Sequence, residues 1–122
     1  MENIKIKSFT DLNAWKEGHL LVLMVYKNTE NFPKSEIFGL TNQMRRAVVS
    51  VTCNIAEGFS RITAKDKCHF YSIASGSLTE LQNQLIVARD LKFLEKSNFD
   101  KVAHQTVEVA KLISGLKRIG RS

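Results

Sequence analysis

Hydrophobic residues recur along most of this chain at intervals of three and four positions. This spacing places them on one face of an α-helix. No strand-like alternation of apolar and polar residues competes with this helical pattern. The periodic segments predict four helices, at about residues 9–29, 35–58, 64–90 and 98–118.

The breaks between these segments coincide with known helix-boundary signals. Ser8 and Thr63 each precede an aspartate by three positions, which is the spacing of a capping box. Pro33, the only proline, suits the start of a helix, and Gly58 suits a C-terminal cap. Ser97 is placed to begin the last helix.

Four helices joined by short connections have to pack antiparallel to their neighbours. We therefore predict a single all-α domain over residues 1–122, folded as an antiparallel up-down-up-down four-helix bundle. The hydrophobic content of 43% is sufficient for a core. The expected core positions outside residues 35–58 are Leu12, Trp15, His19, Val22 and Tyr26, then Phe70, Ala74, Leu78, Leu81, Leu85 and Ala88, and finally Val102, Val109, Leu112, Ile113, Leu116 and Ile119.

The helix predicted over residues 35–58 has two apolar groups. The core group is Ile37, Leu40, Met44, Ala47, Val48, Val51, Ile55 and Phe59. Phe38, Val49 and Ala56 lie beside it and widen the apolar arc to roughly 200°, about twice what one packed face needs. We interpret this helix as the centre of an oligomer.

Gly76 lies in mid-helix, where glycine costs about 1 kcal/mol relative to alanine. Either another backbone approaches closely there, or the position is an exposed, poorly optimised turn. The first interpretation gives a predicted oligomer interface of Phe38, Val49, Ala56 and Gly76.

A polar stripe runs along the opposite side of residues 35–58. It contains Arg46, Ser50, Asn54 and Glu57. Buried charges need partners, and Glu57 and Glu80 are candidates to pair with Arg45 or Arg46. The stripe is then a structural polar network of Arg46, Asn54, Glu57 and Glu80. The alternative is a solvated face with loose ion pairs.

The chain carries 18 Lys and Arg against 12 Asp and Glu, which gives a formal net charge of +6. The tail from Lys111 onward has no acidic residue. Such patches attract phosphate backbones through counterion release, although they also occur as solvated surface and as cations near a helix C-terminus. The candidate nucleic-acid-binding residues are Arg45, Arg46, Arg61, Lys65, Lys67, Lys117, Arg118 and Arg121.

Catalytic and metal chemistry have little support in the sequence. His19, His69 and His104 belong to no metal-binding or catalytic motif, and no glycine-rich phosphate loop is present. We expect no catalytic residue, no metal and no cofactor.

Cys53 and Cys68 form no C-x-x-C pair and are typical of reduced thiols. No apolar run reaches the length of a membrane span, and the N-terminus lacks a signal-peptide core. We therefore expect a cytoplasmic protein with no membrane partner.

Several motifs occur in a family-specific order. They include N-I-A-E-G at residues 54–58, G-S-x-x-E-L at residues 76–81, and Phe32-Pro33. With these motifs the chain resembles, over nearly its whole length, the bacterial four-helix-bundle proteins encoded in intervening sequences of 23S rRNA genes, often labelled ribosomal-protein-like. It is also similar to accessory proteins of diversity-generating retroelements. Gly18 departs from the usual alanine, and Thr52-Cys53 from a proline or small-residue pair.

The resemblance implies a ring-like homopentamer that associates with structured RNA or with a nucleic-acid-processing partner such as a reverse transcriptase. The leading hypothesis is thus a non-enzymatic, homo-oligomeric scaffold that binds RNA or DNA through clustered Lys and Arg. The alternative is a protein–protein adaptor with no direct nucleic-acid role. A helical ribonuclease or phosphotransfer domain needs a histidine in a local motif, which His69 and His104 lack.

Overall fold

The computed structural model describes the backbone of residues 5–121 and the side chains of residues 5–119. This part of the chain is helical throughout, with short connections and no β-strand. Its elements are the 3₁₀ turn η1 (Phe9–Asp11), α1 (Asn13–Thr29), the 3₁₀ turn η2 (Lys34–Glu36), α2 (Leu40–Ser60), α3 (Ala64–Asp90) and α4 (Lys96–Arg121).

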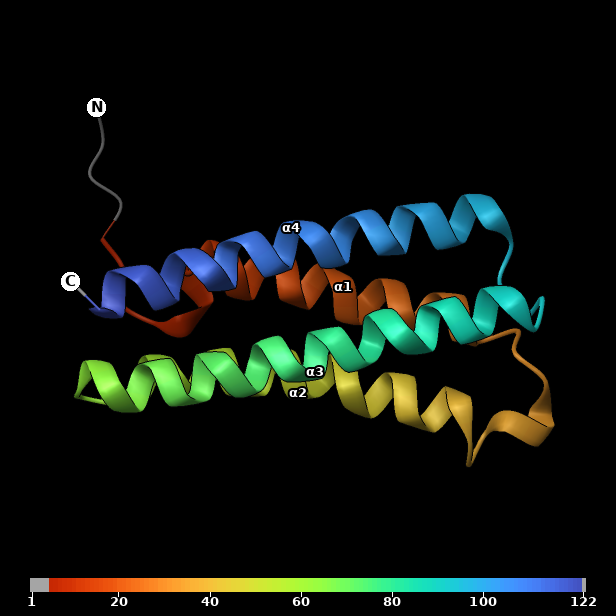
Figure 1. The fold of residues 1–122 in the computed structure, drawn as a ribbon, viewed down its shortest axis with the longest axis horizontal. Coiled ribbons are helices and arrows are strands. Elements are labelled where there is room, and N and C mark those ends of the chain that lie inside the picture. The colour runs from red at the N-terminus through yellow and green to blue at the C-terminus, as the bar shows by residue number, and fades with distance from the viewer. Residues whose placement is uncertain (1–4, 122) are drawn as a thin grey trace.

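The four α-helices run alternately up and down and form a bundle (Figure 1). Each helix packs against two others, in the cyclic order α1, α2, α3, α4. The predicted four-helix bundle is therefore confirmed. The end of α2, the start of α3 and the end of α4 all lie at the same end of the bundle, at the left of Figure 1.

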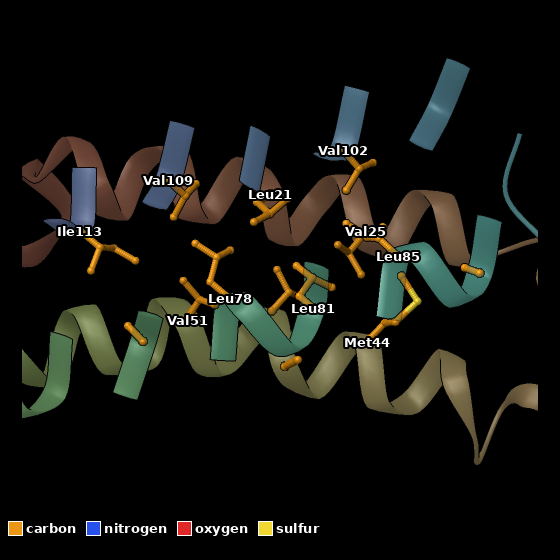
Figure 2. Packing of buried hydrophobic residues seen from close by; sticks show 14 of the residues in the cluster. Leu21, Val25, Met44, Val51, Leu78, Leu81, Leu85, Val102, Val109 and Ile113 are labelled. Atoms are coloured by element: carbon orange, nitrogen blue, oxygen red, sulfur yellow. The ribbon is translucent and has the colours of Figure 1, made fainter. Parts of the chain in front are cut away.

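Side chains from all four helices meet along the axis of the bundle (Figure 2). Leu21, Val51, Leu81 and Val109 are fully buried there, one from each helix. The core positions expected on α2 and α3 are largely confirmed, from Met44 through Ile55 and from Ala74 through Ala88. On α3 the buried series begins at Tyr71, whereas the adjacent Phe70 is only half-buried.

The face that α1 turns to the core differs from the predicted one. The buried residues of α1 are Ala14, Gly18, Leu21, Val25 and Thr29, about a quarter-turn away from the predicted series of Leu12, Trp15, His19, Val22 and Tyr26. His19 is exposed and stacks on Trp15 with ring centroids 4.8 Å apart. The prediction was wrong because residues 20–25 are apolar on every side, so their spacing does not select one face.

The second helix starts five residues later than expected. Glu36 accepts a hydrogen bond from the backbone N–H of Leu40 at 3.1 Å and so stabilises the start of α2. Ile37 and Phe38, expected on the core and interface faces of this helix, instead precede it and are 51% and 93% exposed. The anchor in this region is Phe32, which is buried against Phe93.

The predicted N-terminal capping residues Ser8 and Thr63 are confirmed, whereas several predicted helix ends differ from the observed ones by a few residues. Ser8 and Asp11 form the predicted capping box, on η1, and the Thr63 hydroxyl accepts from the N–H of Asp66 at 3.1 Å at the start of α3. Gly58 does not end α2, which continues to Ser60. The last helix begins at Lys96, two residues before the predicted start.

The two departures from the family pattern face one another. Gly18 on α1 lies against Thr52 on α2, and a Cβ added to Gly18 would be 3.1 Å from the Thr52 methyl group. Thr52 therefore fills space that alanine at position 18 would need. Helix α1 passes through Gly18 without a break.

Candidate nucleic-acid interface

Five of the predicted cationic residues gather at one end of the bundle. Arg61, Lys65 and Lys67 lie around the short connection between α2 and α3, and Lys117 and Arg118 lie near the end of α4. The Cys68 thiol donates to the Lys117 carbonyl oxygen at 3.6 Å, which places the two segments side by side. We call these five residues the cationic end. The side chain of Arg121, also predicted here, is outside the described residues.

Two members of the cationic end have local partners. Arg61 forms an ion pair with Glu57 at 2.6 Å, and its guanidinium lies 4.5 Å from the centroid of the Phe70 ring. The Lys67 ammonium donates to the Phe59 carbonyl at 2.7 Å, so it caps the C-terminus of α2. Lys67 therefore has a structural role in addition to its charge.

The other three side-chain cations have no acidic partner in the described part of the chain. Lys65 and Arg118 are exposed, and Lys117 is half-buried. The five ion pairs of this part include none of the three. No carboxylate of the described residues therefore lies within ion-pairing distance of these three cations, and they are available to a bound anion.

Arg45 and Arg46 lie away from the cationic end. They were expected with Arg61, Lys65 and Lys67, but they belong to the first half of α2, about 24 Å along the helix from Arg61 at 1.5 Å per residue. Arg45 turns towards α1, where it donates to the Thr29 hydroxyl at 3.0 Å. Arg45 and Arg46 are thus separate from the other predicted nucleic-acid-binding residues whose side chains the structure describes.

The predicted polar network is wrong in its membership. Glu57 pairs with Arg61 one turn later, and Glu80 accepts from Gln84 at 3.3 Å. Neither carboxylate contacts Arg45 or Arg46, and Arg46 has no hydrogen-bond partner among the described residues. Each of these two glutamates pairs with the residue four positions later in its own segment. Such an i,i+4 pair forms without depending on how two helices pack together.

A different network links α2 to α3. The Ser50 and Ser77 hydroxyls are 2.8 Å apart, and the Asn54 amide donates to the Ser50 carbonyl at 2.8 Å and to its hydroxyl at 3.1 Å. Of the predicted members only Asn54 belongs to it. Ser77, which the sequence reasoning missed, is the serine of the G-S-x-x-E-L motif, and that motif was the available signal.

The four residues predicted to form an oligomer interface differ in exposure. Phe38 is 93% exposed and Gly76 is exposed, whereas Val49 and Ala56 are half-buried. Nothing lies within 4 Å of a Cβ added at Gly76. No neighbouring helix of this chain therefore requires glycine there. An interface with a second copy and an exposed, poorly optimised turn both stay predictions for this position.

The substitution Gly76→Ala is expected to reduce the mass of the assembly while stabilising the isolated helix by about 1 kcal/mol. The reason is that alanine favours the helix but adds a methyl group where a second copy is predicted to approach. Light scattering and urea unfolding measure the two effects. Gly115→Ala, in a helical position where the nearest atom would be 3.9 Å from the added Cβ, is the control and should leave the mass unchanged. A more stable Gly76→Ala protein of unchanged mass would contradict the predicted interface.

The histidines have ordinary surroundings. His69 contacts the Phe70 ring edge-on, and His104 lies 3.7 Å from Glu108. Within the described residues, no three His, Cys, Asp or Glu side chains gather as metal ligands would. Burial raises the pKa of Tyr71, whose ring packs against Gly58 of α2. None of the described helices is long and apolar enough to cross a membrane.

The fold and surface define a small helical-bundle protein with a group of five cationic residues at one end. The model of the 23S rRNA-intervening sequence protein family matches residues 10–115, and the chain belongs to this family. The predicted membership is thereby confirmed, whereas the similarity to accessory proteins of diversity-generating retroelements stays a prediction.

A solved structure shares the fold. It is a protein of unknown function from the S23 ribosomal protein family of Bacteroides thetaiotaomicron VPI-5482, with a TM-score of 0.77. The two chains are 17% identical, and the match covers 85% of this chain and 97% of that one. A comparison with curated protein sequences gave no match.

Proposed function

We propose that this protein is a non-enzymatic, homo-oligomeric helical scaffold that binds nucleic acid, RNA in particular, through its cationic end. The observation that carries the proposal is the meeting of Arg61, Lys65 and Lys67 with Lys117 and Arg118 at one end of the bundle. The first three and the last two of these residues are far apart in sequence, and together they come from three helix ends.

The electrostatics of this end suit a polyanion. Lys65, Lys117 and Arg118 have no acidic partner among the described residues, and no acidic residue follows Lys111 in the chain. Cations that contact phosphates release condensed counterions, which favours binding at low salt. An assembly of several copies presents several such sites. A polyanion that contacts more than one copy is therefore bound more tightly than by a single copy.

Exposed apolar side chains support the oligomeric part of the proposal. Leu20 and Leu23 on α1 are 44% and 54% exposed, and Phe38 before α2 is almost entirely exposed. Large apolar side chains on a surface mark sites of protein association when they are contiguous. A ring-like homopentamer, as the family resemblance implies, is the assembly that we propose.

A protein–protein adaptor is the second candidate. The observation that favours it is Ile62, which lies between α2 and α3 beside Arg61 and is 95% exposed. An apolar side chain in this position gains nothing from a phosphate backbone but suits an apolar pocket on a protein, for example a nucleic-acid-processing enzyme such as a reverse transcriptase. In that case Ile62→Ser should abolish capture of the partner, and reversing the charges of the cationic end should not.

The mass of the purified protein in solution, measured by light scattering together with the 260/280 nm absorbance of the same peak, tests the scaffold. We expect about five times the chain mass of 13.8 kDa, with nucleic acid in the peak. A nucleic-acid-free monomer would contradict the proposal.

A further inference from the structure

A second cationic site lies in an open groove of about 530 Å³ between α1 and α2. Tyr26 lines it from α1, and Asn42, Arg45, Arg46 and Cys53 line it from α2. None of the residues that line the groove is acidic. It therefore holds two guanidinium groups and no charge to compensate them.

Arg45 is held in place by neutral groups. Its Nε donates to the Thr29 hydroxyl at 3.0 Å, and Nη2 donates to the Tyr26 carbonyl at 3.4 Å. The guanidinium also lies 4.6 Å from the centroid of the Tyr26 ring. Thr29 is itself buried and donates to the Val25 carbonyl at 2.8 Å, so its oxygen faces Arg45 as an acceptor.

These contacts fix the orientation of Arg45 without neutralising it. A structural arginine usually gains a carboxylate, whereas this one keeps its full charge and leaves part of its planar donor fork free. Arg46, the next residue, is exposed and has no hydrogen-bond or ion-pair partner in the described part of the chain. A concave surface with two such cations concentrates anions.

We propose that this groove binds a phosphate group, with the fixed Arg45 and the free Arg46 as its ligands. Arginine forks match the geometry of phosphate oxygens and form charge-assisted hydrogen bonds with them. The phosphate comes from an RNA strand or from a free phosphate compound. Only the first source rests on the proposed function. The site is distinct from the cationic end, about 24 Å away along α2.

The groove contains its own reporter. Cys53 is an exposed free thiol that lines the groove, and the second cysteine, Cys68, is half-buried near the start of α3 and does not line the groove. In a Cys68→Ser protein, iodoacetamide modifies Cys53 alone. A phosphate bound beside it restricts access and disfavours the reactive thiolate. We expect inorganic phosphate, titrated against chloride at constant ionic strength, to slow alkylation severalfold and with saturation.

Arg46→Gln in the same background should abolish the saturable slowing. Arg89→Gln is the matched control, since Arg89 is an exposed arginine of α3 paired with Asp90 and outside the groove. Phosphate slowing that does not saturate, or that persists in Arg46→Gln, would overturn the proposal. A second result would also overturn it: Cys53 that does not react in the absence of phosphate and becomes reactive only when the protein is diluted. This result would mean that a second copy covers the groove at Val49, which lines the groove and belongs to the predicted oligomer interface.

A short oligouridylate distinguishes the two sources. Protection of Cys53 by the oligonucleotide at concentrations well below those of inorganic phosphate assigns the groove to an RNA strand. Protection by phosphate alone assigns it to a free phosphate compound. Oligonucleotide binding seen by fluorescence polarisation, with Cys53 protected by neither ligand, overturns the groove site and leaves the proposed function intact.

Discussion

Replacing Gly58 with alanine is expected to destabilise the bundle by about 2–3 kcal/mol, in the range of overpacking a closed core. A Cβ at this position would lie 2.6 Å from Cε1 of Tyr71 and 3.2 Å from the Lys67 carbonyl oxygen. The Tyr71 ring is 3% exposed and the carbonyl belongs to the backbone, so neither has room to move. The glycine of N-I-A-E-G therefore lets α3 approach α2.

Urea unfolding followed by circular dichroism measures this effect. Gly115→Ala is the control, because nothing lies closer than 3.9 Å to a Cβ added there. In a double-mutant cycle, Tyr71→Leu should make Gly58→Ala less costly, since the ring is the closer obstacle. A Gly58→Ala protein as stable as the original would show that α2 and α3 do not pack as closely as Gly58 permits.

Reversing the charges of Lys65 and Arg118 together is expected to weaken RNA binding about 100-fold, roughly tenfold for each phosphate that no longer meets a cation. These two cations are exposed and have no acidic partner among the described residues. Neither caps a helix, unlike Lys67, so a folded protein should result. Fluorescence polarisation with a labelled RNA hairpin gives the affinities.

The matched control is Lys34→Glu with Lys101→Glu. Both lysines are exposed and lie in η2 and early in α4, at the opposite end of the bundle. This pair changes the net charge equally, so it measures how much of the effect comes from total charge. Equal decreases in affinity for the two double variants would contradict a localised cationic end and would leave only a general attraction between a basic protein and RNA.

The reliability of the sequence predictions followed the strength of the local signals. Helix α3 occupies its predicted range, 64–90, because the Thr63 cap and a regular apolar series agree. The start of α2 was missed because the Glu36 side chain caps it across a turn. The α1 face was missed because residues 20–25 offer apolar side chains in every direction.

The predicted positions of the candidate-site residues were also correct where they depended on local sequence spacing. Arg61, Lys65 and Lys67 were expected together because three residues or fewer separate each from the next. That Lys117 lies beside them depends on the antiparallel bundle, which the sequence also predicted. Arg45, by contrast, turns to Thr29 on another helix, and this choice depends on side-chain geometry that the spacing of residues does not specify.

The salt dependence of RNA affinity tests the central claim most directly. Fluorescence polarisation with the unmodified protein, over a series of potassium chloride concentrations, gives the slope of log affinity against log salt. With three or more phosphate contacts at the cationic end, each contributing about 0.7 to the slope, we predict a slope of about −2 or steeper. Affinity that does not change with salt, or the absence of RNA binding at low salt, would contradict it.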